Sequence, residues 1–155
     1  MECFTFTGRA RRAIQAAGDE AAALGHEYIG PEHILLALLH DRESAAVGIL
    51  AGLGSDLDTI RGMVEAVVKK GTSSAPAGAS RPFTSRVKSS LELAMACARE
   101  CSNSSVGTQH LLVGLMREGK GIAAQVLMHS GMTIDQVVGA LGRAADDDDV
   151  TRKGH

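Results

Sequence analysis

The chain contains one sequence pattern twice. Residues 6–64 reappear as residues 83–141 at a constant offset of 77 positions and without a gap. Solenoid repeats are shorter, about 20–50 residues, so we expect each copy to be a small bundle and the pair to close into one domain with pseudo-twofold symmetry. The matched positions are Phe6, Thr7, Arg9, Gly30, His33, Leu35, Leu38, Ala46, Leu50, Gly54 and Asp58 with Phe83, Thr84, Arg86, Gly107, His110, Leu112, Leu115, Ala123, Leu127, Gly131 and Asp135.

The hydrophobic pattern predicts an all-α fold. Aromatic residues are scarce, and apolar residues recur three and four positions apart instead of alternating. The first copy should form a helix from Thr7, as N-cap, to about residue 24, and then helices over 31–40, 44–51 and 55–69. The second copy should repeat them over 84–101, 108–117, 121–129 and 133–142. The result is eight helices as two four-helix repeats.

The length and charge of the chain limit its class. A domain of 155 residues buries roughly 68–70% of its unfolded surface and needs no disulfide. The net charge of −2, from 16 basic and 18 acidic residues, provides no general attraction to nucleic acid. No apolar stretch approaches about 18 residues, and Met1–Phe4 does not resemble a leader. We expect a monomeric, cytoplasmic protein without a nucleic-acid or membrane partner.

The expected domain covers residues 1–145. Repeat one should span about 6–69 and repeat two about 83–142. The linker of about 70–82 is rich in Gly, Ser, Ala and Pro, which predicts a flexible, exposed and protease-sensitive connector. Residues 146–155 begin with four aspartates and predict a disordered tail, with a partner-binding acidic patch as the alternative.

The three cysteines do not form a recognisable motif. Cys97 and Cys101 lie four positions apart, on one face of a predicted helix. We interpret them as small buried apolar side chains, with redox chemistry or metal binding as alternatives. Cys3 lies near the terminus and is the cysteine that we expect to be most reactive.

No pattern in the chain predicts an enzyme or a cofactor. Residues 114–121 fit G-x-x-x-x-G-K, but Gly121 stands where a phosphate loop needs Ser or Thr, and no strand is predicted before it. His33 and His110 have no ligand partner four positions on, so we interpret both as hydrogen-bonded structural residues. We therefore expect no catalytic residue, no metal and no cofactor.

A polar set occurs in both copies. Thr7, Arg9 and Glu32 in the first copy correspond to Thr84, Arg86 and Gln109 in the second. Helix N-termini attract anions and a carboxylate attracts a guanidinium, so this set could bind a ligand with both charges. Helix capping alone is the alternative interpretation.

The same residues resemble a known family. Phe6-Thr7-Gly8-Arg9 with Tyr28-Ile29-Gly30-Pro31-Glu32-His33, and Phe83-Thr84-Ser85-Arg86 with Val106-Gly107-Thr108-Gln109-His110, are similar to the double repeat of the Clp N-terminal domain, closest to the ClpC type. The resemblance covers about 6–142. It implies an eight-helix module, flexibly attached to AAA+ unfoldase rings, that receives substrates and adaptors for the ClpP protease. The chain stops before any ATPase module, which suggests a freestanding or excised domain.

The resemblance also implies ligands. ClpC-type domains bind phosphoarginine, a degradation mark, at two symmetric sites. By position, Thr7 would hold the phosphate and Glu32 the guanidinium, while Thr84 and Gln109 would form the second site. The family usually has Glu where this chain has Gln109, so we expect the second site to be the weaker one. Pro31, where the family usually has Thr, is a departure from the pattern in the first site.

A second ligand class follows from the same resemblance. Cyclic peptide antibiotics dock on related domains at a surface to which Phe83, Lys88 and Glu92 correspond, and Cys3 replaces a usual Phe there. The leading hypothesis is a non-enzymatic module that recognises phosphoarginine-bearing proteins or adaptors and modulates Clp proteolysis. The rivals are a decoy that sequesters such peptides and an adaptor or structural subunit that docks on a Clp ring.

Overall fold

A computed structural model describes residues 5–142 and confirms the all-α fold. The described part contains eight helices and two very short strands. The first repeat holds β1 (Thr5–Phe6), α1 (Gly8–Ala23), α2 (Pro31–His40), α3 (Ala45–Gly52) and α4 (Leu57–Val67). The second holds α5 (Ser85–Glu100), β2 (Ser105–Val106), α6 (Thr108–Glu118), α7 (Ile122–His129) and α8 (Ile134–Leu141). The predicted tail at 146–155 lies outside the described residues.

Local sequence signals determine where the helices begin. Thr7 Oγ1 accepts a hydrogen bond from the Ala10 N–H at 3.1 Å, and Thr84 Oγ1 accepts the equivalent bond from the Val87 N–H at 3.2 Å. Each threonine thus satisfies one N–H group that has no partner inside its helix. Pro31 is the first residue of α2, as predicted.

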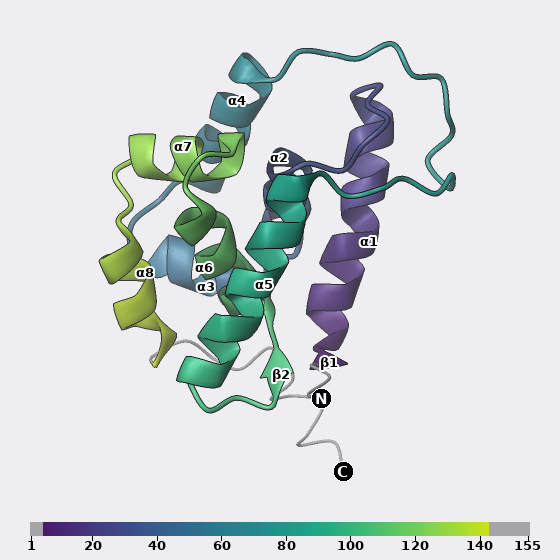
Figure 1. Ribbon diagram of the computed structural model, residues 1–155. Coiled ribbons are helices and arrows are strands. Elements are labelled where there is room, and N and C mark those ends of the chain that lie inside the picture. The colour runs from purple at the N-terminus through teal and green to yellow at the C-terminus, as the bar shows by residue number, and fades with distance from the viewer. Residues whose placement is uncertain (1–4, 143–155) are drawn as a thin grey trace.

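The core is built around α2 and α6. These helices are buried on nearly all sides, with Leu35, Leu38, Leu112 and Leu115 at most 1% exposed. Each has its own repeat's long helix on one side, α1 on α2 and α5 on α6, and the other repeat's short helix against it, α7 on α2 and α3 on α6 (Figure 1). Because each repeat supplies part of the other's packing, the halves form one core.

The strand pairings were not predicted from the sequence. Phe6 pairs with Val106 in the parallel β1–β2 ladder, and Phe83 pairs with Ile29 in an isolated parallel bridge. These pairs are equivalent under the offset of 77, since Phe83 matches Phe6 and Val106 matches Ile29. The start of each repeat therefore pairs with the loop before the central helix of the other.

The connector between the repeats is exposed over most of its length, as expected. It nevertheless makes specific contacts with the domain. The N–H groups of Gly71 and Ser73 donate to the carbonyls of Leu24 and Gly25 at 2.7 and 2.8 Å. Arg81 is 9% exposed, and its guanidinium donates to the His26 carbonyl at 2.9 Å and the Ala75 carbonyl at 2.8 Å. These bonds hold both ends of the connector against the loop that follows α1.

The residues that resemble a phosphate loop belong to ordinary helical packing. Gly114 lies in α6, where an added Cβ would collide with the Ser90 backbone carbonyl of α5. Gly119 ends α6 with φ at 81°, and Gly121 caps α7. Gly114 thus lies inside a helix, whereas a phosphate loop joins a strand to a helix. Among residues 5–142, no helix is long and apolar enough to span a membrane.

Candidate functional site

The predicted partners Thr7 and Glu32 lie at opposite ends of a helix pair. Thr7 caps the start of α1, whereas Glu32 is in the first turn of α2, after the loop that follows the end of α1. The 16 residues of α1 extend about 24 Å at the usual rise per residue. Figure 1 shows β1 at the lower end of α1 and this loop at its upper end. The predicted pairing of Thr7 with Glu32 is therefore wrong.

The structure instead brings Glu32 together with Thr84. An open hollow of about 450 Å³ is lined by Tyr28, Gly30, Glu32, Ser73 and Thr84, and we call it the first pocket. The Thr84 N–H donates to the Ile29 carbonyl at 3.0 Å, which places the start of α5 beside the loop before α2. The pocket is thus built from both repeats. It combines a half-buried carboxylate with the N-terminus of a 16-residue helix.

Glu32 lies close to the backbone of its own loop. A Cβ added at Gly30 would be 2.6 Å from Glu32 Oε1, so the carboxylate occupies space that a side chain at position 30 would fill. Gly30 is itself the N-cap of α2. The absence of a side chain at position 30 therefore leaves room for this carboxylate in the lining of the first pocket.

A chain of two histidines supports the same pocket. His33 Nδ1 accepts from the Gly30 N–H at 2.8 Å, so the neutral ring carries its proton on Nε2. That proton points to His26 Nδ1 at 2.7 Å, and His26 Nε2 in turn donates to the Lys69 carbonyl at 2.6 Å. Burial, followed by the nearby His26 and Arg81, lowers the pKa of His33 to about 4. The structural role predicted for His33 is confirmed.

The equivalent histidine of the second repeat has the same role. His110 Nδ1 accepts from the Gly107 N–H at 2.9 Å, and Nε2 lies 3.0 Å from Asn103 Oδ1. Asn103 corresponds to His26 under the offset of 77. The histidine cap is therefore common to both repeats, whereas its outer partner differs.

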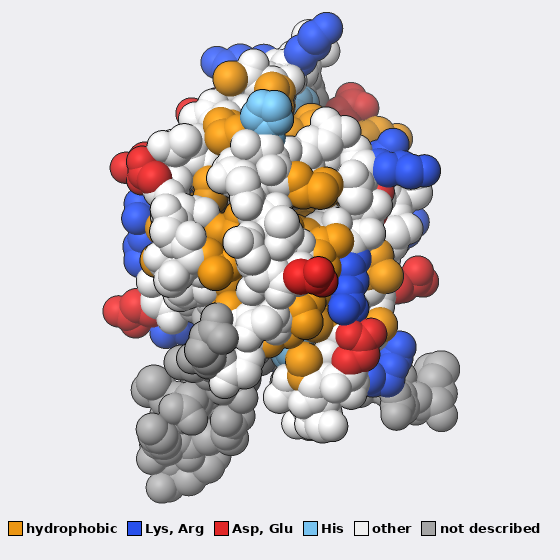
Figure 2. Space-filling view, turned by 90° about the vertical axis from the view of Figure 1, so that its left-hand side faces the viewer, with side chains coloured by type: hydrophobic (Ala, Val, Ile, Leu, Met, Phe, Trp, Pro, Cys, Tyr) orange, Lys and Arg blue, Asp and Glu red, His pale blue; other side chains and the backbone are white. Residues whose placement is uncertain are grey.

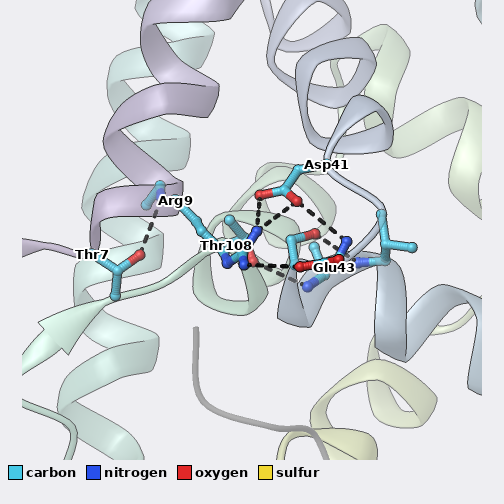
Figure 3. A network of polar contacts seen from close by, with 9 residues as sticks. Thr7, Arg9, Asp41, Glu43 and Thr108 are labelled. Carbon is cyan, nitrogen blue, oxygen red and sulfur yellow. Dashed lines mark hydrogen bonds and ion pairs between the residues drawn. The ribbon is translucent and has the colours of Figure 1, made fainter. Parts of the chain in front are cut away.

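The two predicted arginines form ion pairs within their own repeats. Arg9 Nη1 donates to both oxygens of Asp41 at 2.7 and 2.8 Å, and Arg86 Nη1 donates to Glu118 at 3.0 Å. Asp41 and Glu118 are themselves equivalent under the offset. Figure 3 shows Arg9 reaching from α1 to Asp41 and Glu43, away from Thr7. These arginines join the start of each long helix to the end of the following one, so we do not retain them as ligand contacts.

At the other end of the domain, Thr7 lies with the start of α6. The Thr7 N–H donates to the Val106 carbonyl at 2.9 Å, and Thr108 Oγ1 accepts from the Ala46 N–H at 3.0 Å. Gln109 follows and is 8% exposed. Its Oε1 is buried without a hydrogen-bond partner in the described part of the chain. Thr84 and Gln109, predicted as a second site, are therefore in different places.

The residues predicted for cyclic peptides cluster around α5. Phe83 is half-buried beside the cap of this helix, and Lys88 and Glu92 are exposed one turn apart. Cys3 lies outside the described residues. Of the other cysteines, Cys97 is buried as predicted, whereas Cys101 is exposed, which corrects our interpretation of it. Cys101 is the C-cap of α5, where the helix no longer covers it.

A separate apolar hollow of about 500 Å³ lies between α4 and α7, lined mainly by Met63, Val67, Ile122 and Val126. Figure 2 looks onto this side of the molecule, where hydrophobic side chains show among backbone and other side chains, with charged groups around them. The lining has no carboxylate to orient a cation. It is therefore a poor candidate for a ligand with two opposite charges.

Sequence reasoning missed three contributors to the first pocket. His26 and Tyr28 precede a predicted helix, and Tyr28 is 55% exposed at the pocket. The single tyrosine of the chain, next to a repeated Gly-x-x-His motif, was a usable signal. Ser73 comes from the connector, and nothing in its composition predicted a pocket wall.

Comparison with known proteins defines the family. A family model described as Clp repeat (R) N-terminal domain matches residues 5–130 and, in a second match, residues 82–146. The chain belongs to this family of Clp N-terminal domains. The two overlapping matches agree with the duplication seen in sequence and structure.

Relatives with longer chains share this domain. The chain is 40% identical over 131 residues to the "Negative regulator of genetic competence ClpC/MecB" of Bacillus subtilis, covering 84% of this chain and 16% of that protein. It is 38% identical over 145 residues to the chloroplastic "Chaperone protein ClpC" of Pisum sativum, covering 91% of this chain and 16% of the relative. The chain therefore spans about one sixth of the length of these relatives.

A solved structure has the same fold. The N-terminal domain of the "Caseinolytic protease associated chaperone ClpD" from Arabidopsis thaliana is 27% identical, with a TM-score of 0.68 over 97% of this chain and 95% of that one. The chain is thus related to the N-terminal regions of Clp ATPase subunits.

Proposed function

We propose that this chain is a non-enzymatic recognition module of the Clp protease system that binds phosphoarginine-bearing proteins. The observation that carries the proposal is the first pocket, where Glu32 and the N-terminus of α5 line one hollow. Phosphoarginine has a cationic guanidinium beside an anionic phosphate, so its recognition needs both kinds of partner within one small site.

Each part of the pocket suits one part of this ligand. The Glu32 carboxylate can accept charge-assisted hydrogen bonds from the guanidinium. The first-turn N–H groups of α5, next to Thr84, attract the phosphate through their partial positive charge. The Tyr28 ring at the pocket offers an aromatic face to the planar guanidinium.

The opposite end of the domain should bind the same ligand less well. Gln109 stands there in place of a carboxylate, beside Thr7 instead of Thr84. Charge-assisted hydrogen bonds contribute about 1.5–3 kcal/mol and neutral ones about 0.5–1.5 kcal/mol. A difference of about 1 kcal/mol corresponds to roughly fivefold weaker binding.

Calorimetric titration with free phosphoarginine tests the proposal. Glu32→Gln should weaken binding about fivefold or more, whereas Glu92→Gln, on the exposed face of α5, should leave it unchanged. Arginine and inorganic phosphate, each carrying half of the recognised group, should bind much more weakly. Equal binding of phosphoarginine by the parent and Glu32→Gln proteins would exclude the first pocket as the site.

A second candidate function is capture of cyclic peptides. It is favoured by the exposed residues Lys88 and Glu92, which lie one turn apart on α5, the helix that follows Phe83. Titration with a ClpC-directed cyclic peptide antibiotic should then show binding that Lys88→Glu weakens and Glu32→Gln leaves intact. A chain that binds neither ligand but co-purifies with an assembled Clp ring would instead be an adaptor or structural subunit.

A further inference from the structure

Two cysteines and a histidine converge at the junction of α5 and α6. One potential ligand atom from each of Cys97, Cys101 and His110 lies within 4.8 Å of the other two. Cys97 is in the last turn of α5, Cys101 is its C-cap, and His110 is the third residue of α6. From this convergence we propose a binding site for a thiophilic d¹⁰ cation such as Zn²⁺ or Cu⁺.

The spacing suits such a cation. Residues four apart on a helix lie on one face, so the two sulfur atoms point the same way. Two sulfur atoms bound to one tetrahedral Zn²⁺ at about 2.3 Å from the metal lie roughly 3.8 Å apart. The observed separations of at most 4.8 Å need only a small contraction.

The donor types determine which metals fit. Thiolates and imidazole favour Zn²⁺ and Cu⁺, whereas Mg²⁺ and Ca²⁺ prefer oxygen ligands. Cys97 is 1% exposed, which would shield the bound ion, and Cys101 is exposed, which gives the ion a path of entry. A site with three protein ligands also leaves a position open to water.

The hydrogen bonds of His110 rank the three ligands. Its Nδ1 accepts from the Gly107 N–H at 2.9 Å, so the neutral ring carries its proton on Nε2, which lies 3.0 Å from Asn103 Oδ1. Binding through Nε2 requires this proton to move to Nδ1, and the hydrogen bond from the Gly107 N–H is then lost. Each thiol also gives up a proton on binding, but neither thiol has to give up a helix-cap hydrogen bond. The two thiolates are therefore the main ligands and His110 is the third.

The first repeat serves as an internal comparison. Its residues at the equivalent positions are Glu20, Leu24 and His33, so the histidine cap is present there without either thiol. The histidine cap of a central helix therefore forms without a cysteine beside it. The pair of thiols is a feature of the second repeat alone and is independent of the first pocket.

Titration of the reduced full chain with Cd²⁺ tests the site, because cadmium thiolates absorb in the ultraviolet. We expect one Cd²⁺ per chain, competition by an excess of Zn²⁺, and a rise in the melting temperature on binding. Cys97→Ala and Cys101→Ser should each weaken binding about a hundredfold or more, and His110→Gln about tenfold. The matched control is Cys3→Ser, which removes the remaining thiol of the chain and should bind like the parent.

Circular dichroism shows whether each variant is folded. If His110→Gln does not fold, the Cd²⁺ affinities of the two cysteine variants and the stoichiometry of one Cd²⁺ per chain still test the proposal. Full affinity in Cys101→Ser or Cys97→Ala would overturn the proposal, as would loss of binding in Cys3→Ser. Full affinity in folded His110→Gln would overturn the three-ligand assignment.

Discussion

Acidification should destabilise this domain through His33. The ring is 1% exposed, and burial, His26 and Arg81 lower its pKa from 6.5 to about 4. The unfolded chain therefore takes up a proton on this residue at a higher pH than the folded chain does. The free energy of unfolding contributed by His33 is fully present above pH 6.5 and is lost as the pH falls toward about 4.

The size of the effect follows from the gap between the two pKa values. The difference between 6.5 and about 4 is roughly 2.5 units, and each unit corresponds to about 1.4 kcal/mol. Complete acidification should thus cost about 3.5 kcal/mol, of which about 3 kcal/mol is lost by pH 4. Protonation also breaks a specific contact, because a ring protonated at Nδ1 can no longer accept from the Gly30 N–H.

Urea unfolding between pH 7.5 and 4 measures this cost. His33→Gln should be less stable at pH 7.5 but should lose about 3 kcal/mol less than the parent on acidification. His129→Gln, at an exposed position on α7, should follow the parent curve and serves as the control. If His33→Gln does not fold, an NMR titration of the parent ring replaces the comparison. Parallel pH profiles for parent and folded His33→Gln, or a ring that titrates near 6.5, would refute the reasoning.

Two further outcomes are expected from the packing. Cleavage at a protease site placed within residues 74–80 should leave the halves associated in size-exclusion chromatography, because α7 packs on α2 and α3 on α6; halves that separate would contradict the shared core. Gly114→Ala should destabilise the domain by about 1–3 kcal/mol in urea unfolding, since its Cβ would collide with the Ser90 carbonyl. Gly62→Ala, in open space on α4, is the matched control and should be neutral or stabilising.

The helices could be predicted because their signals are local. Thr7 and Thr84 were recognised as N-caps, and the structure shows both accepting from the N–H three residues on. The apolar periodicity of each segment identified the core faces. The crossed strands could not be found in the same way, because a strand of two residues has no measurable period.

The individual site residues were easier to predict than their grouping. Glu32 and Thr84 were both predicted as site residues. Each was paired with a residue of its own repeat, because the motifs of one repeat follow one another in the sequence. Arg9 and Arg86 were selected for their charge. Their partners, Asp41 and Glu118, lie 32 residues further on, and no local pattern links them.

The crossed closure of the repeats explains why a duplication did not give two self-contained sites. The start of each repeat pairs with the other repeat's loop, Phe6 with Val106 and Phe83 with Ile29. The N-capping threonine of each repeat therefore lies beside the central helix of the other repeat. Thr84 lies with Glu32 of α2, and Thr7 lies toward Gln109 of α6. A substitution in one repeat consequently changes a site whose other half belongs to its duplicate. The replacement of a carboxylate by Gln109 affects the end that holds Thr7 and leaves the first pocket with its own carboxylate.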